Sequence, residues 1–392
     1  MLRAKAADIA PILNAEVATN EALGRLSDPA MAALRSGDFF AMFAPRCYGG
    51  FETGPVEGLE VIEALCTADG SAGWVVMAAG LCIAAAGAFL DDAGAEAVFR
   101  NGRAPVIAGH GGPNGKAVVE GKGFRLSGQW QYGSGIQNAD FIHSGAVIYE
   151  NGAPRLTASG HPEIRIFVTP RSDAVLAGNW DVLGLRATGS VDYTMTDLYV
   201  GEEFSHLQSA QDPKRGGKNY TIGLLGFAVI GHTGFALGVG RRALDEVAKY
   251  ARGRSGPTGA LGASDSFKEG YGTAEAQFRA ARALVYETWR DIEATINAGE
   301  RMSTRQITLA RLAMNHVTNM AAEAATFAYR IAGGTSLRES ALQRCFRDIH
   351  AGTQHLHASP IILRECGREL AGMAEGEIWG RFGLSAGGGA LR

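Results

Sequence analysis

Three of the nine histidines of this chain lie within eight residues, at His350, His355 and His357. An imidazole has an ordinary pKa of about 6.5, so it can take up or release a proton near neutral pH and serve as a general acid or base. Hydrophobic spacing predicts a helix over 340–372, on which His350 and His357 share a face. His355 then points about 140° away from His350, toward a pocket that the other two do not share. The alternative is a polar helix end with a solvated histidine pair.

Two glycine-bearing segments could approach a ligand closely. Tyr132-Gly133-Ser134-Gly135 ends a predicted strand, where glycine lets the backbone approach a flat molecule and Ser134 offers a hydroxyl. Gly333-Gly334 follows a predicted helix over 303–332. The alternative for the first segment is a plain β-turn, because glycine and serine both favour turns.

Two arginines lie where they could serve a binding site. Arg254 falls in the predicted turn between two long helices, and a guanidinium there suits an anionic phosphate because it donates several charge-assisted hydrogen bonds. Arg186 opens the segment Arg186-Ala187-Thr188-Gly189-Ser190, in which Arg186 and Ser190 could form the wall of a site. The alternatives are a solvated basic loop at Arg254 and a strand turn pinned by Arg186.

Composition describes an ordinary globular protein. The chain has 392 residues, of which 20% are charged and 46% hydrophobic, and a net charge of −3. This length suffices for two or three packed units, and this charge gives no electrostatic case for nucleic acid or an anionic membrane. The five cysteines lack Cys-x-x-Cys spacing and no His-Glu-x-x-His segment occurs. We therefore expect reduced thiols, a cytoplasmic location and no metal site.

Two uncharged stretches, 70–90 and 223–240, are long enough to cross a bilayer. Both are rich in glycine, the first also in alanine, and Asp69, Asp91 and Asp92 flank the first without a lysine or arginine anchor. We interpret both as buried helices whose small residues allow close packing, and we expect no membrane partner.

The order of elements predicts an α+β protein. Residues 1–104 show helical spacing, 105–205 show short alternating strands, and 206–392 return to long helices, which we predict to be three domains. This order excludes a Rossmann domain or a TIM barrel, where strands and helices alternate throughout. Ser303 and Gln306 have the spacing of a capping box. The last domain is predicted to contain helices over 221–252, 272–298, 303–332 and 340–372.

This layout resembles the acyl-CoA dehydrogenase superfamily, and within it the flavin-dependent monooxygenase branch that includes the oxygenase components of phenol hydroxylases and dibenzothiophene monooxygenases. Three segments carry the resemblance: Gly128–Gly135, Trp180–Ser190, and Gly333-Gly334 leading to Arg347-Asp348 and His355. The resemblance implies an N-terminal helical domain, a middle β-barrel domain and a C-terminal four-helix bundle.

The resemblance also implies roles for the residues named above. It places Tyr132, Gly133 and Ser134 against a flavin ring, with the Ser134 hydroxyl near flavin N5. It places Arg186 and Ser190 in the wall of the same site and Arg254 at the flavin phosphate. Gly333 and Gly334 lie where the superfamily brings backbone close to the cofactor of a neighbouring subunit. A homo-oligomer, most often a tetramer, is therefore expected.

At the catalytic position the chain departs from the dehydrogenases of the superfamily. Many of them place a glutamate base nine residues beyond the arginine of the Arg-Asp pair, where this chain has Leu356. Leucine cannot remove a proton. His355, one residue earlier, coincides with the histidine of the monooxygenase branch, and could take a proton from a phenol or enol or steady a hydroperoxide.

A second departure concerns the substrate pocket. Many phenol hydroxylases of the branch carry a further histidine eight residues after a tryptophan, and here Trp74 is followed at that spacing by Cys82. His110 is expected on a loop near the flavin, where it could substitute for that histidine. Its alternative is an exposed turn residue. His143, His161, His206, His232 and His316 are interpreted as structural.

The function predicted from these residues is a flavin-dependent monooxygenase. It would oxygenate a small aromatic or cyclic conjugated substrate, free or CoA-linked, through a peroxyflavin, with O2 as co-substrate and FAD or FMN as cofactor. A separate flavin reductase could supply reduced flavin, and both catabolic and antibiotic-biosynthetic roles fit. Two alternatives stay open: an acyl-CoA dehydrogenase or oxidase without the usual glutamate, and a non-catalytic oligomeric scaffold.

Overall fold

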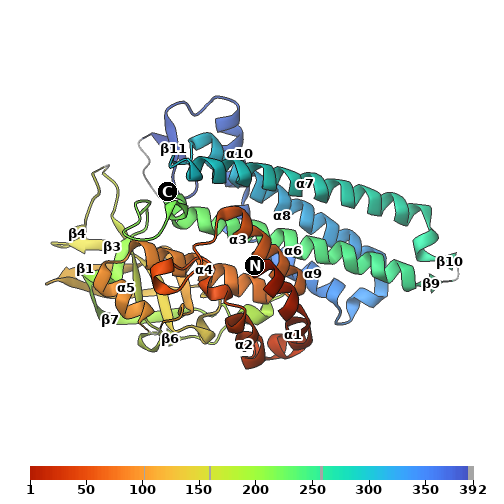
Figure 1. Cartoon of the computed structure of the whole chain (residues 1–392), viewed down its shortest axis with the longest axis horizontal. Coiled ribbons are helices and arrows are strands. Elements are labelled where there is room, and N and C mark those ends of the chain that lie inside the picture. The colour runs from red at the N-terminus through yellow and green to blue at the C-terminus, as the bar shows by residue number, and fades with distance from the viewer. Residues whose placement is uncertain (101, 159, 257–258, 387–392) are drawn as a thin grey trace.

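The structure is a computed structural model that describes residues 1–100, 102–158, 160–256 and 259–386. Helices come first, a sheet follows and long helices close the chain, so the predicted fold class is confirmed (Figure 1). The long helices extend away from the sheet, and the N-terminal helices lie beside both. The helices that position the site are α1 (Leu2–Leu23), α2 (Asp28–Ser36), α3 (Pro55–Ala68), α4 (Gly70–Phe89), α5 (Asp92–Phe99), α6 (Gly223–Gly253), α7 (Asp265–Asn297), α8 (Thr304–Ala332), α9 (Ala341–Gly352) and α10 (Pro360–Leu370).

Helices α4 and α6 form the centre of the core. Both are long and apolar enough to cross a membrane by length and composition, yet 89% and 94% of their most apolar windows are buried inside the protein. Their glycines permit close contact, since a Cβ added at Gly231 of α6 would lie 2.6 Å from the sulfur of Met77 on α4. The interpretation of both stretches as buried core helices agrees with this packing.

The sheet runs in the order β6-β7-β2-β1-β3-β5-β8, with β4 paired to β3. Strand β1 is antiparallel to β2 and parallel to β3, and its register shifts between His110 and Gly115. Trp130 and Tyr193 stack with ring centroids 5.3 Å apart in the core of this sheet. The strands are β1 (Ile107–Glu120), β2 (Gly123–Trp130), β3 (Phe141–Glu150), β4 (Ala153–Pro154), β5 (Ile164–Pro170), β6 (Val175–Leu176), β7 (Tyr193–Gly201) and β8 (Ser205–Leu207).

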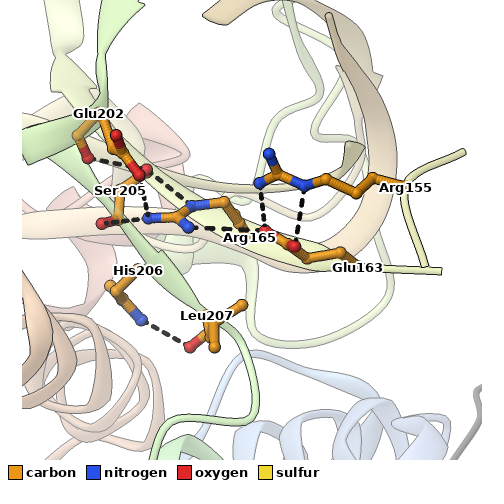
Figure 2. A network of polar contacts seen from close by, with 7 residues as sticks. All are labelled: Arg155, Glu163, Arg165, Glu202, Ser205, His206 and Leu207. Carbon is orange, nitrogen blue, oxygen red and sulfur yellow. Dashed lines mark hydrogen bonds and ion pairs between the residues drawn. The ribbon is translucent and has the colours of Figure 1, made fainter. Parts of the chain in front are cut away.

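A polar network fixes the edge strand β8 to β5 (Figure 2). The Arg165 guanidinium donates to the hydroxyl and the carbonyl of Ser205, at 3.0 and 3.3 Å. Glu163 lies 3.5 Å from Arg165 and accepts two hydrogen bonds from Arg155. These contacts pair the polar groups at the sheet edge, and the Nδ1 atom of the neighbouring His206 lies 2.9 Å from the Leu207 carbonyl oxygen.

The predicted helix over 340–372 is wrong, because the chain breaks it into α9 and α10. Helix α9 ends at Gly352, and His355 lies in the connection with extended backbone. The Nδ1 atom of His355 accepts the backbone N–H of His357 at 3.3 Å. Pro360 then opens α10, and a proline both disfavours helical geometry in the residue before it and suits a first helical position. The predicted capping box of Ser303 and Gln306 at α8 is confirmed.

Arg347 and Asp348 of α9 join the three parts of the chain. Arg347 donates to the carbonyl of Leu183 at 3.0 Å and pairs with Glu21 of α1 at 2.9 Å. The Asp348 carboxylate accepts the backbone N–H of Leu185 at 2.7 Å. Both partners of the Arg347–Glu21 pair are about nine-tenths buried, so each charge depends on the other.

This ion pair yields a prediction about stability. Arg347→Met should destabilise the protein by about 3–5 kcal/mol, because Glu21 keeps a buried charge without its partner. The double variant Arg347→Met/Glu21→Gln should lose less than the sum of the single variants. Chemical unfolding at one fixed protein concentration measures this, with the exposed Arg338→Met as control. Additive single effects would contradict the coupling.

Candidate active site

Aromatic and imidazole rings from three elements meet between the sheet and the bundle. Trp74 comes from α4, His232 from α6, and His355 from the α9–α10 connection. The His232 and His355 ring centroids are 3.8 Å apart, and the Trp74 ring lies 5.0 Å from His232 and 6.1 Å from His355. Beside these rings is a small cavity lined by His232, Phe235, Met314, Thr318, Gly352, His355, His357 and Ala358, and Trp74 contacts its two imidazoles without lining it.

His357 shares this pocket, which corrects the prediction that His350 and His357 lie on one face. The His357 ring is 5.2 Å from His355 and 5.8 Å from His232. His350 lies elsewhere, with its Nε2 atom 3.0 Å from the Thr326 hydroxyl and its ring against Phe346. The helix break causes the change, because a continuous helix would keep the spacing that places His350 and His357 together.

His232 is a site residue that sequence reasoning assigned to structure. It is 9% exposed and faces the other two imidazoles. A polar ring in an otherwise apolar, glycine-rich stretch of α6 was the only signal, and such a residue is ambiguous without its neighbours. Trp74 was noted only for its spacing to Cys82, and its contact with His232 and His355 could not be read from the sequence.

Burial keeps these imidazoles neutral. Desolvation, with smaller contributions from His110 and Arg381, lowers the pKa of His355 to about 4. Desolvation also lowers the pKa of His232 and His357 well below the ordinary value. Because the Nδ1 atom of His355 accepts the His357 N–H, the neutral ring of His355 carries its proton on Nε2 and can donate a hydrogen bond there.

Ser134 ends a directed chain of hydroxyl groups. Trp74 Nε1 donates to Ser134 Oγ at 3.0 Å, Ser134 and Ser190 lie 2.7 Å apart, and Ser190 and Thr188 also lie 2.7 Å apart. Thr188 donates its single hydroxyl proton to the Leu185 carbonyl at 2.8 Å. It follows that Ser190 donates to Thr188 and Ser134 donates to Ser190. Ser134 is therefore left with one unused acceptor lone pair and no spare proton.

His110 and Cys82 lie on the sheet side of the core. His110 belongs to strand β1 and is half-buried, so the expected loop and its alternative as an exposed turn are both wrong. Its backbone N–H donates to the Tyr193 hydroxyl at 3.1 Å, and its Nδ1 atom has no partner among the described residues. Burial with the nearby Arg381 lowers the pKa of His110 to about 4. Burial raises the pKa of the Cys82 thiol, so Cys82 stays protonated and is no base.

Arg254 and Gly333-Gly334 lie at the opposite end of the bundle. Figure 1 shows the turn between α6 and α7, marked by β9 (Ser255–Gly256) and β10 (Gly259–Ala260), far from the sheet. The Tyr250 hydroxyl lies 3.3 Å from the Ala332 carbonyl, and this brings the end of α6 beside Gly333-Gly334. Within one chain these residues therefore do not join Ser134 in one site.

The remaining predicted site residues lie around Ser134. Tyr132 is 62% exposed in a left-handed conformation, and Arg186 is exposed. Gly133 is buried, and its N–H donates to the Val191 carbonyl at 3.1 Å. Among the residues with described positions, no group of three or more His, Cys, Asp or Glu is arranged to hold a metal ion.

The residues present fit a flavin. Ser134 has a free acceptor, and the buried Nδ1 atoms of His110 and His357 have no partner in the described parts of the chain. At Gly333 and Gly334 an added Cβ would meet no atom within 4 Å, so backbone is open to a ligand there. Ser134 could face the ring system, and Arg254 with Gly333-Gly334 of another copy could hold the phosphate end.

Comparisons with known proteins agree with this geometry. Residues 230–360 match the family model of the acyl-CoA dehydrogenase C-terminal domain. An indole-3-acetate monooxygenase of Pseudomonas putida is 31% identical over 350 residues, which cover 88% of this chain and 87% of the relative. The chain belongs to the flavin-dependent monooxygenase branch of the acyl-CoA dehydrogenase superfamily. The predicted family and enzyme class are thereby confirmed, with flavin as cofactor and O2 as co-substrate.

Solved structures show the same fold. The 3-HSA hydroxylase from Rhodococcus sp. RHA1 has a TM-score of 0.87 at 24% identity and covers 95% of this chain and 97% of its own. XiaF from Streptomyces sp., in complex with FADH2 and glycerol, has a TM-score of 0.86 at 23% identity, with 95% of each chain covered. At 24% and 23% identity, the likeness of these two solved structures to the chain concerns the fold alone.

The buried histidines of this monooxygenase predict acid lability. Lowered pKa values mean that the unfolded chain binds protons more tightly, so this stabilisation is present above about pH 6.5 and is lost as pH falls toward about 4. The melting temperature should therefore drop over that interval. The buried Asp348, whose pKa is raised to about 7, acts in the opposite sense. Thermal unfolding between pH 4 and 8 checks this, and a flat profile below pH 6.5 would contradict it. The histidines concerned are His110, His143, His206, His232, His355 and His357.

The geometry also predicts the effect of removing His355. His355→Ala should fold and bind flavin, while product formation falls about 10²–10⁴-fold, as expected for one positioned acid–base group. H2O2 release should rise, because reduced flavin then reacts with O2 without a productive outlet. His350→Ala is the matched control, since His350 lies outside the pocket, and it should stay within a few-fold of wild type. Equal behaviour of the two variants would refute the role of His355.

Proposed function

We propose that this chain is the oxygenase component of a two-component monooxygenase that hydroxylates a small aromatic substrate in the pocket of Trp74, His232 and His355. The observation that carries the proposal is this group of rings between the sheet and the bundle. Aromatic rings, neutral imidazoles and apolar side chains come together there, and none of the residues that line the small cavity is a carboxylate. Such surroundings suit a flat, apolar ring and exclude water. The relative from Pseudomonas putida is named for an aromatic substrate, indole-3-acetate.

His355 is the proposed proton-bearing side chain beside the substrate. Its Nδ1 atom accepts the His357 N–H, so its neutral ring carries the proton on Nε2 and can donate a hydrogen bond to a phenol oxygen or to the oxygen that is transferred. Reduced flavin, when bound, supplies the two electrons with which O2 is activated. One oxygen atom then enters the substrate and the other leaves as water. The protein contributes orientation, exclusion of water and the hydrogen-bond donor.

Ser134 is proposed to act as a hydrogen-bond acceptor toward the cofactor. The directed chain through Ser190 and Thr188 consumes the hydroxyl proton of Ser134, and Trp74 occupies one of its lone pairs. The remaining lone pair of Ser134 can accept a hydrogen bond from an N–H, as on the reduced ring system. Ser134 has no free proton to donate to an unprotonated nitrogen. This arrangement would favour the reduced cofactor over the oxidised one.

The separation of Ser134 from Arg254 supports an oligomer. The candidate ring-binding and phosphate-binding residues lie at opposite ends of one chain, so a complete site needs residues of a second copy. We propose a homotetramer that receives reduced flavin from a separate reductase. Against the dehydrogenase alternative, Leu356 occupies the position of the glutamate, cannot remove a proton and is 47% exposed.

The decisive experiment mixes enzyme, chemically reduced FAD or FMN and an aromatic substrate panel under 18O2. One labelled oxygen atom per product molecule is expected, together with tighter binding of reduced than of oxidised flavin. Ser134→Ala should narrow that difference in affinity by about tenfold, since one charge-neutral hydrogen bond is lost. Reduction of bound flavin by an acyl-CoA in the absence of O2, or product without label, would overturn the proposal.

A further inference from the structure

A C-terminal hairpin places an arginine beside the pocket. Strands β11 (Glu377–Trp379) and β12 (Leu384–Ala386) flank a turn that carries Arg381, and Figure 1 shows β11 at the end of the bundle next to the sheet. The Arg381 guanidinium lies 4.8 Å from the Phe382 ring centroid, and that ring is 6.3 Å from His357. Its positive charge contributes to lowering the pKa of His110, His355 and His357.

Helix α8 holds the turn that carries Arg381 through hydrogen bonds to its backbone. Arg311 of α8 is 2% exposed and donates to the carbonyls of Arg381 and Gly380, both at 3.0 Å. The Arg311 guanidinium also stacks on the Trp379 ring at 4.2 Å, and Trp379 donates to the Thr308 hydroxyl at 2.7 Å. Two nitrogens of Arg311 thus donate to backbone carbonyls of the turn, while its Nε atom has no partner in the described part of the chain. These bonds position the backbone at Arg381 and do not neutralise the charge of Arg381.

No carboxylate neutralises Arg381 within residues 1–100, 102–158, 160–256 and 259–386. Three acids of the same segment pair elsewhere: Glu365 and Glu377 with Arg368, and Glu369 with Arg305 at 2.9 Å. The fourth, Glu375, is exposed and forms no ion pair with Arg381. Burial lowers the pKa of Arg381, which reflects a desolvated cation without a compensating charge. Such a cation is costly unless a ligand brings an anion to it.

We propose that Arg381 is a specificity-determining residue that binds the carboxylate of an aromatic acid, so that the substrate is an aromatic ring bearing a short acidic side chain. The ring would lie among Trp74, His232 and His355, and the carboxylate would reach the guanidinium beside His357. A planar guanidinium binds a carboxylate through two parallel hydrogen bonds, which also sets the orientation of the ring relative to His355. This inference rests on the proposed function for the identity of the pocket, but it concerns binding and can be measured without turnover.

The experiment compares acids with their neutral amides. Binding of benzoate, phenylacetate and indole-3-acetate, each beside its carboxamide, is measured by calorimetry on the holoenzyme and by KM where product forms. Wild type should bind at least one acid about 10–100-fold more tightly than its amide, as expected for a charge-assisted bidentate pair. Arg381→Gln should abolish that preference and leave binding of the amide within about twofold. Arg381→Lys should restore part of the preference, because the charge remains and the two-pronged geometry is lost.

A control variant and the outcomes that would contradict the proposal show whether the anion bound by Arg381 belongs to the substrate or to the cofactor. Arg364→Gln removes an exposed charge from α10 and should leave the acid preference intact. If Arg381→Gln instead weakens flavin binding and both ligands alike, the guanidinium serves an anionic group of the cofactor and the proposal is overturned. Lack of an acid preference in all three wild-type pairs also overturns it. Failure of 18O incorporation with the acid preference intact would strike the proposed function alone.

Discussion

The Arg347–Asp348 pair on α9 is the interaction on which the arrangement of the site depends. Arg347 and Asp348 bond to Leu183 and Leu185 in the connection between β6 and β7, and Arg347 also pairs with Glu21 of α1. These buried contacts join the sheet region and the N-terminal helix to the C-terminal bundle. Gly184 permits this contact, since a Cβ there would lie 2.0 Å from the Arg347 carbonyl oxygen. The same segment continues to Thr188 and Ser190, so the clamp also positions the hydroxyl chain that ends at Ser134.

Desolvation is the second constraint, and it sets the chemistry. The pocket is built from imidazoles that are too buried to carry charge, next to arginines whose charge cannot be removed. Neutral imidazoles beside the Arg381 guanidinium are compatible with the acidic aromatic substrate proposed above. The contrast with the dehydrogenase arrangement is physical: a leucine replaces the carboxylate at the offset of the catalytic glutamate, and the proposed catalytic side chain is a histidine one residue earlier.

The errors in the sequence interpretation arose where a local contact or a strand irregularity, and not hydrophobic periodicity, determined the backbone. The helix over 340–372 was predicted from apolar spacing, but spacing alone does not register a local side-chain contact such as His355 Nδ1 with the His357 N–H. Once the helix breaks, His357 turns into the pocket and His350 stays outside it. His110 was expected in a loop because the resemblance to the family places a loop there, yet this segment forms a strand whose register shifts beside His110. Local composition could not distinguish a bulged strand from a loop.

The sequence by itself determined the order of helices and strands, the buried nature of the two uncharged helices, the capping of α8 and the family, because these depend on periodicity and on short motifs. It also proposed Ser134 and His355 as site residues. Only the tertiary structure decided that His232 and Trp74 lie against His355, that Ser134 has an acceptor but no proton to offer, and that Arg381 has no carboxylate partner among the residues whose structure is described. These properties depend on groups that come from distant parts of the chain, and the distances and burial that govern them are absent from a one-dimensional pattern.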